Sequence, residues 1–306
     1  MPVRGWTKKG IVVLSLFDGI ASGLEALKRA NIKVSKYYSS EIDPNAIKVA
    51  NDRHPEIIQL GNVENWRDWD IPKPDLILGG SPCQGFSYSG KLLNFTDPRS
   101  KLFFDFVDIV NHYKPKNWLL ENVVMKQEYQ DVISHHLKVQ PVKICSSLVS
   151  AQTRPRNYWC NWEVPMPTDR GIEVSSVLSK NLDWFPAAIR GRKINPETMR
   201  RDDKNPDVPY SQMLTVKKRG EKMGCLTTVA KDTVLSRFSE GLYFASDYEQ
   251  GVDWRYLERV EYERLQTLPD GYTSSVSDGI AKALCGNGWT IDVIIHILES
   301  QPNFFI

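Results

Sequence analysis

The chain has 306 residues, of which 41% are hydrophobic and 25% charged, so it can bury a sizeable core and is not expected to be disordered. Lysine and arginine number 39 and aspartate and glutamate 37, and the resulting net charge of +2 does not by itself indicate a nucleic-acid-binding protein. Length alone suggests one large domain or two unequal domains.

The five cysteines are scattered along the chain, at Cys83, Cys145, Cys160, Cys225 and Cys285. There is no C-x-x-C pair and no histidine at zinc-ligand spacing, so no metal site is expected. The sequence MPVRGWTKKG lacks the apolar stretch of a signal peptide, and no segment reaches the ~18 apolar residues of a membrane helix. We therefore expect an intracellular protein in a reducing compartment, with no membrane partner.

The first half of the chain alternates short apolar runs with amphipathic or polar stretches, the pattern of a parallel sheet with crossover helices. It predicts strands at residues 11–17, 34–40, 57–60, 75–78 and 118–120. It also predicts a helix through Leu24 and Leu27 and another over 43–51, which begins with an Asp-Pro pair. This is a Rossmann-like βαβ progression.

The pattern changes at about Ile144, where the β-rich runs ICSSLVSA and RNYWCNW flank the turn-like QTRPR and predict a hairpin that ends the sheet antiparallel. Periodicity is lost after Glu163 and returns after Trp254, with helical signals in YLERVEYERLQTLP and over 291–298. We predict a catalytic and cofactor-binding domain over 1–163, a smaller domain over 164–254, and a return segment over 255–306 that completes the first domain.

The segment LSLFDGIASG carries the first candidate site, because a strand ends at Phe17 and Asp18, Gly19 and Gly23 form the turn into a helix. Glycines at such a turn let a ligand approach the backbone, and an acid after the next strand can bind ribose hydroxyls, which suits Glu41. A purely structural turn is the alternative. The absence of G-x-G-x-x-G argues mildly against a nicotinamide dinucleotide.

The segment DLILGGSPCQGFSYSG is more specific, because a buried strand runs directly into a loop that carries Cys83. Most free cysteines are small core residues, but the flanking Gly, Pro and Gln84 make a core position implausible here. A thiolate is a competent nucleophile when nearby positive charge or a helix terminus lowers its pKa.

Two further segments supply partners for this cysteine. WLLENV places Glu121 just past another apolar strand, so Glu121 and Cys83 should project from the same sheet edge, unless the carboxylate only caps a turn. SAQTRPRNYW offers Arg154 and Arg156 on a tight turn, for which a solvated hairpin loop is the alternative.

The segments FDGIASG, GGSPCQGFS, ENV, QTRPR, RLQTLPDGY and GNGW occur in the order and approximate spacing of the DNA cytosine-5 methyltransferase family, and the chain resembles that family nearly throughout, apart from about residues 163–254. VSAQTRPRNYW is similar to the branch of the mammalian de novo enzymes, whereas the compact length is more like a bacterial or phage enzyme. The resemblance implies a Rossmann-like methyltransferase fold with a target-recognition domain over 164–254. It also implies S-adenosyl-L-methionine as methyl donor, double-stranded DNA as partner, a monomer, and the cytoplasm of a bacterial or phage-host cell, or the nucleus if the source is eukaryotic.

The resemblance also implies a covalent mechanism. The Cys83 thiolate would add to C6 of cytosine, because C5 alone is too weak a nucleophile to attack a methyl group. Glu121 would hold N3 and the exocyclic amine, Arg154 would orient the base, and Arg156 would brace the active-site loop or a phosphate. The target base lies inside a stacked duplex and would have to be flipped into the pocket.

The remaining site residues follow from the same resemblance. The donor would contact Phe17, Asp18, Gly19, Gly23, Glu41, Ile42, Asn62, Val63, Pro82 and Asn287. DNA would contact Gln84, Ser87 and Gly90 on the loop after Cys83, and Thr227, Thr228, Lys231 and Arg237 in the middle stretch. The basic runs RGRK, MRRDD and KKRGEK would hold phosphates, although each could equally be a solvated surface.

The chain departs from the family pattern in two places. Asn62 stands where the family commonly has Asp, and it can accept a hydrogen bond from the adenine amine only through an uncharged oxygen. Gly288 and Trp289 stand where many relatives have a small polar residue and Val, which changes the pocket in a way the sequence does not define.

Three other functions compete with this one. An RNA cytosine methyltransferase would use the same active-site residues, and only the sizeable middle stretch favours duplex DNA. A catalytically silent DNA-binding relative is disfavoured by the intact Cys83, Glu121 and Arg154. A nicotinamide-dependent oxidoreductase would need a hydride-transfer pocket, of which the sequence gives no sign.

Overall fold

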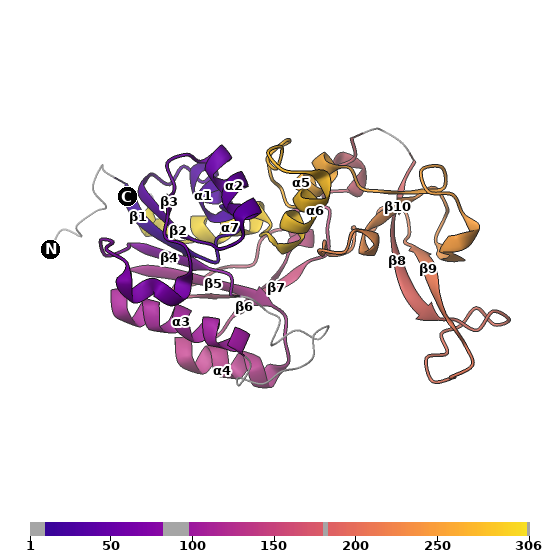
Figure 1. Cartoon of the computed structure of the whole chain (residues 1–306), viewed down its shortest axis with the longest axis horizontal. Coiled ribbons are helices and arrows are strands. Elements are labelled where there is room, and N and C mark those ends of the chain that lie inside the picture. The colour runs from indigo at the N-terminus through magenta and orange to yellow at the C-terminus, as the bar shows by residue number, and fades with distance from the viewer. Residues whose placement is uncertain (1–9, 82–97, 180–182, 305–306) are drawn as a thin grey trace. The chain divides into compact units, whose positions relative to one another are not determined.

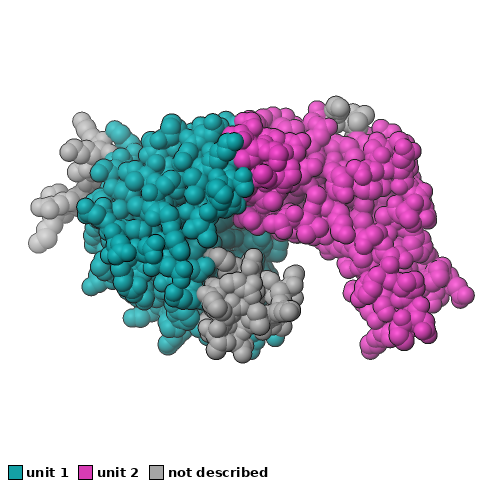
Figure 2. Space-filling model, viewed as in Figure 1, with its two compact units in different colours: residues 1–145, 155–168, 288–306 teal, residues 146–154, 169–287 magenta. Residues whose placement is uncertain are grey.

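The computed structural model describes residues 10–81, 98–179 and 183–304. The chain divides into two compact units (Figure 2). Unit 1 comprises Met1–Cys145, Pro155–Thr168 and Gly288–Ile306, and unit 2 comprises Ser146–Arg154 and Asp169–Asn287. The boundaries predicted after residues 163 and 254 concern functional domains and stay a prediction.

Unit 1 is built on a seven-stranded mixed sheet with the strand order β3-β2-β1-β4-β5-β7-β6. The strands are β1 (Ile11–Leu16), β2 (Val34–Ser40), β3 (Ile58–Gln59), β4 (Leu76–Gly79), β5 (Asn117–Val123), β6 (Val142–Cys145) and β7 (Pro155–Cys160). The first five run parallel, and β7 is antiparallel to both β5 and β6. The predicted mixed α/β sheet with an antiparallel end is therefore confirmed.

Helices cover both faces of this sheet (Figure 1). The helices α1 (Ser22–Arg29), α2 (Pro44–Arg53) and α7 (Ile291–Glu299) lie on one face, and α3 (Pro98–Tyr113) and α4 (Gln127–Leu137) lie on the other. Phe103 and Phe106 of α3 and Ile133 of α4 pack with the sheet in a buried cluster. Because both faces are covered, the strands read as continuous apolar runs, which is why the sequence reveals them.

Local sequence sets where α2 begins. Asp43 accepts a hydrogen bond from the backbone N–H of Asn45 at 2.9 Å, and Pro44 occupies the first turn, where its missing N–H costs nothing. The loop that carries Glu41 therefore ends at a fixed point, directly after β2.

Unit 2 contains a five-stranded antiparallel sheet that the sequence did not predict. Its strand order is β11-β9-β8-β10-β12. The strands are β8 (Phe185–Lys193), β9 (Tyr210–Val216), β10 (Val234–Ser236), β11 (Gly241–Phe244) and β12 (Trp254–Tyr256). A small apolar cluster holds it, formed by Ala187, Ile189, Leu214, Val216, Val234 and Trp254. The helices α5 (Arg259–Leu265) and α6 (Asp278–Asn287) also belong to this unit.

The predicted hairpin is only partly a strand pair. β6 and β7 pair antiparallel, with Ile144 opposite Arg156. The run SSLVSA after β6 is not a strand, because Ser146–Leu148 form a 3-10 turn and the chain from Ser146 to Arg154 belongs to unit 2.

Candidate active site and methyl-donor site

The polar residues that the sequence singled out come just after β1, β2 and β4 in the sequence, and Glu121 lies in the carboxyl-terminal half of β5. These strands are adjacent in the sheet and parallel, so their carboxyl ends meet at one edge. Ligands bind at such an edge in open α/β sheets. The sequence motifs are thus brought together by topology.

The turn after β1 has an unusual backbone. Phe17, Gly19 and Ala21 all have positive φ, at 56°, 59° and 59°. Such conformations cost free energy for residues with a Cβ and are typical of functional turns. A Cβ at Gly19 would meet nothing within 4 Å, so this side of the turn is open.

Glu41 ties this turn to the loop after β2. Its Oε2 accepts from the backbone N–H of Gly19 at 2.8 Å, and its Oε1 accepts from those of Ile42 and Asp43 at 2.8 and 2.9 Å. The carboxylate is therefore held in place before any ligand arrives.

Asp18 lies beneath the turn and is buried. Its Oδ1 accepts from the Ser15 and Tyr37 hydroxyls at 2.6 and 2.7 Å, whereas its Oδ2 has no hydrogen-bond partner. Burial raises the pKa of Asp18 to about 6, against the lowering effect of these hydroxyls. Asp18 therefore titrates close to neutral pH and supports the turn from below.

The predicted adenine contacts lie after β2 and β3. The side chain of Ile42 is 70% exposed, which is unusual for a large apolar residue. Asn62 caps the 3-10 turn Val63–Asp68 by accepting from the backbone N–H of Glu64 at 3.1 Å, and Val63 is buried. The Asn62 carbonyl oxygen, predicted to accept from adenine, already has this one donor.

The segment with the predicted nucleophile follows β4 directly in the sequence. Pro82, Cys83, Gln84, Ser87 and Gly90 lie outside the described residues. Ser81, just before them, is buried and receives two contacts from the Asn122 amide, at 3.1 Å to its Oγ and 3.3 Å to its carbonyl oxygen. The end of β5 thus holds the residue before this segment.

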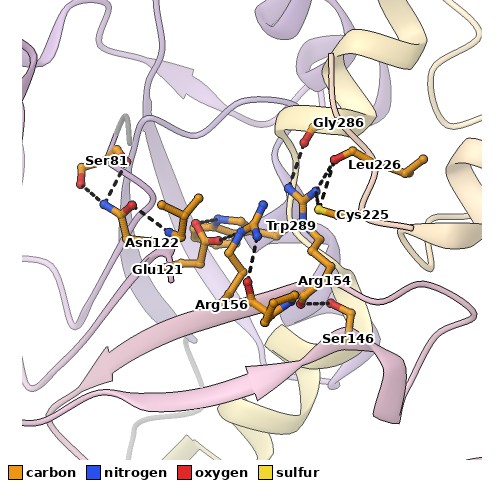
Figure 3. A network of polar contacts seen from close by, with 12 residues as sticks. Ser81, Glu121, Asn122, Ser146, Arg154, Arg156, Cys225, Leu226, Gly286 and Trp289 are labelled. Carbon is orange, nitrogen blue, oxygen red and sulfur yellow. Dashed lines mark hydrogen bonds and ion pairs between the residues drawn. The ribbon is translucent and has the colours of Figure 1, made fainter. Parts of the chain in front are cut away.

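Glu121 lies in β5 and is nearly enclosed, with 9% of its surface exposed. Arg156 on β7 approaches its Oε1 with Nε at 3.0 Å, and the indole N–H of Trp289 donates to its Oε2 at 3.1 Å. Figure 3 shows the carboxylate between these two side chains. A buried carboxylate with a donor on each oxygen has a fixed orientation.

Arg154 makes its contacts within unit 2, where it is buried. Its Nη1 donates to the Leu226 carbonyl at 2.8 Å and its Nη2 to the Gly286 carbonyl at 2.9 Å (Figure 3). These contacts join the segment after Cys225 to the end of α6. The expectation that Arg154 orients a substrate base, and that Arg156 braces the active-site loop or a phosphate, stays a prediction; in the structure the arginine beside Glu121 is Arg156.

The predicted DNA-reading residues Thr227, Thr228, Lys231 and Arg237 belong to unit 2. Thr227 Oγ1 donates to Asp232 at 3.0 Å, and Lys231 Nζ donates to Gln212 Oε1 at 3.2 Å. Thr228 and Lys231 are exposed, and the Arg237 guanidinium lies 4.9 Å from the centroid of the Trp184 ring. Asn287, a predicted donor contact, is the exposed last residue of α6.

Two of the other cysteines are poor nucleophiles. Cys160 and Cys285 are buried, and burial raises the pKa of both thiols. Within residues 10–81, 98–179 and 183–304, no group of three or more His, Cys, Asp or Glu side chains could hold a metal ion. None of the helices in these ranges is long and apolar enough to cross a membrane.

Two site residues were not predicted from the sequence. Asn122 was passed over although it stands in the quoted ENV segment, and Trp289 was noted only as a departure in GNGW. Trp289 is 168 positions away from the glutamate that it contacts, so only the fold reveals the pair.

Comparison with known proteins finds similarity to cytosine-specific DNA methylases and to type II methyltransferases. The family model of C-5 cytosine-specific DNA methylases matches residues 11–139. The type II methyltransferases M.NlaIV of Neisseria lactamica and M.NgoBV of Neisseria gonorrhoeae are 34% and 33% identical over 167 residues, which is 54% of this chain. The matched part spans only 38% of each of these two relatives. M.NlaX of Neisseria lactamica is 27% identical over 94% of this chain and 95% of its own length.

Solved structures share the fold. A putative DNA modification methyltransferase encoded within an E. coli prophage has a TM-score of 0.65 at 17% identity, covering 96% of this chain and 99% of its own. A mutant DNMT2 of Spodoptera frugiperda has a TM-score of 0.60 at 18% identity, covering 95% and 99%. The Rossmann-like fold predicted from the sequence is thereby confirmed.

Proposed function

We propose that the chain is a member of the C-5 cytosine-specific DNA methylase family and that it transfers the methyl group of S-adenosylmethionine to C5 of a flipped-out cytosine in duplex DNA. One observation carries this proposal. Glu121 is enclosed between Arg156 and Trp289, on the strand next to the one that leads into Cys83.

The residues after β1, β2 and β3 fit the proposed methyl donor. The backbone is open at Gly19 and at Gly61, where a Cβ would meet nothing within 4 Å. Glu41 offers carboxylate lone pairs to ribose hydroxyls, and the exposed Ile42 offers an apolar surface to a flat base. When bound, the donor supplies an electrophilic methyl group on a sulfonium.

The chain's own residues account for the activation of cytosine. The Cys83 thiolate forms a bond to C6, the C5–C6 π electrons become available at C5, and N3 takes a proton from the Glu121 carboxyl group. After C5 is methylated, a base removes the C5 proton, the Cys83–C6 bond breaks, the thiolate returns, and N3 gives its proton back to Glu121. Enclosure of Glu121 keeps water from competing for the base edge.

We assign the two arginines differently from the sequence-based expectation. Arg156 lies on Glu121 and is placed to orient the base beside it. Arg154 braces the Leu226 backbone in unit 2, next to the predicted DNA-reading Thr227. Unit 2 would bind the duplex through that segment and through basic side chains such as Lys231.

A methyl-transfer assay tests the proposal. Purified protein with tritiated S-adenosylmethionine should label unmethylated phage λ DNA, and Cys83→Ser should bind the donor but transfer no methyl group, because a hydroxyl is a far weaker nucleophile than a thiolate. Persisting turnover in Cys83→Ser would refute the covalent scheme. If transfer RNA is labelled and DNA is not, the substrate of the same reaction is RNA.

Bisulfite sequencing of DNA from cells that express the protein would then identify the modified sequence. Cytosines that remain convertible at every site, despite folded protein in those cells, would contradict the assignment to DNA.

A further inference from the structure

Trp289 packs against the backbone at two points of the candidate site. A Cβ at Gly80 would lie 2.9 Å from the indole Nε1, and a Cβ at Gly23 would lie 3.7 Å from its Cζ3. Gly80 leads into the Cys83 loop, and Gly23 lies in the first turn of α1. The indole therefore occupies space that both glycines leave free, beside the turn after β1 and the start of the nucleophile loop.

The same indole makes a directed polar contact with Glu121. Its N–H donates to Oε2 at 3.1 Å, while Arg156 Nε lies 3.0 Å from Oε1. A carboxylate has about four lone-pair sites, so one donor on each oxygen leaves further acceptor capacity on both. Glu121 is thus fixed in orientation and can still engage a cytosine edge.

We propose that Trp289 is a positioning residue for Glu121, a role that rests on the proposed function. Its N–H fixes the rotation of the carboxylate, and its ring excludes water from Oε2. A glutamate without this contact could rotate about its last side-chain bonds and would present the correct edge to the base only part of the time. The effect should fall on the chemical step rather than on donor binding.

Trp289→Phe isolates the hydrogen bond, because phenylalanine keeps an aromatic ring and lacks the N–H. Loss of a hydrogen bond to a charged group should lower kcat roughly ten- to hundredfold, whereas the dissociation constant of the methyl donor should change by less than about twofold. Both are measured with tritiated donor on phage λ DNA and by calorimetric titration with S-adenosylhomocysteine.

Trp162→Phe is the matched control. The Trp162 indole N–H also donates to protein acceptors, the Ile297 carbonyl and the Ser300 hydroxyl, both at 3.1 Å. Removing that N–H leaves Glu121 untouched, so kcat should stay close to that of the wild type. A Trp289→Phe enzyme with wild-type kcat, or one that loses donor affinity in proportion to kcat, would overturn the proposal.

A second measurement does not need activity. In a double-mutant cycle of Trp289→Phe and Glu121→Ala, the losses in unfolding free energy should be non-additive, because either change removes the same contact. Strict additivity would overturn the proposal. If the wild type methylates no DNA, the proposed function fails by itself, and the cycle still decides whether Trp289 holds Glu121.

Discussion

Gly286 in α6 should tolerate no side chain, because its helix lies directly on a predicted DNA-reading segment of unit 2. A Cβ there would lie 2.5 Å from both the carbonyl carbon and the oxygen of Thr227 and 2.9 Å from the Thr228 nitrogen. These atoms are backbone and cannot rotate away. Gly286→Ala therefore forces the helix end and the segment apart by roughly 1 Å, since ordinary contacts begin near about 3.4 Å.

The change in the free energy of unfolding that Gly286→Ala causes is the balance of two opposed effects. Overpacking of a well-packed site costs about 1–3 kcal/mol, and alanine recovers at most about 1 kcal/mol over glycine in a helix. We expect Gly286→Ala to lower the free energy of unfolding by about 1–2 kcal/mol, measured by urea denaturation. It should also weaken DNA binding, because Thr227 and Thr228 are displaced.

Gly279 provides the control in the same helix. It is exposed, and a Cβ there would meet nothing within 4 Å. Gly279→Ala should therefore be neutral or stabilise the protein by up to about 1 kcal/mol. The reasoning is refuted if Gly286→Ala unfolds at the same urea concentration as Gly279→Ala.

Three further outcomes are expected. Asp18 has a pKa of about 6 in the folded protein, above its value in the unfolded chain, so the folded state binds the proton more tightly. The free energy of unfolding should therefore fall by about 3 kcal/mol as the pH rises from about 4 to 6. Thermal unfolding across that range should show this slope in the wild type and not in Asp18→Asn, and parallel curves would contradict it. Arg154→Lys should mainly lower the melting temperature, because two buried carbonyls lose their donor, whereas Arg156→Lys should mainly lower kcat; the opposite pattern would restore the roles expected from the sequence. Asn122→Ala releases Ser81 and should reduce kcat by roughly tenfold or more at unchanged donor affinity, and an unaltered kcat would show that this tether is dispensable.

Much of unit 1 could be predicted from the sequence because its strands are marked by short, local runs of apolar residues. Strands covered on both faces are short apolar runs, and parallel topology brings their ends together, so residues after these runs, such as Glu41, could be expected at one edge. The expected meeting of Glu121 and Cys83 at that edge stays a prediction. The sheet of unit 2 offered no such signal. β8 contains Pro186 and Gly191, which are uncommon in strands, and becomes a strand through its pairing with β9 and β10.

The roles of the two arginines of QTRPR could not be distinguished from the sequence. Arg154 and Arg156 are two positions apart and have the same charge, so nothing local separates their roles. β7 begins at Pro155, and the chain passes from unit 2 to unit 1 between them. The partner of each guanidinium is therefore decided by long-range packing.

The way the chain passes between the units also affects protein engineering. Unit 2 consists of two separate pieces, and its short piece, Ser146–Arg154, is bounded on both sides by strands of the other unit. A graft that transplants only residues 169–287 into a homologous scaffold would leave behind Gln152, whose amide reaches the Leu265 carbonyl and the Gln266 side chain. Chimeras designed to exchange sequence preference should therefore carry both pieces together.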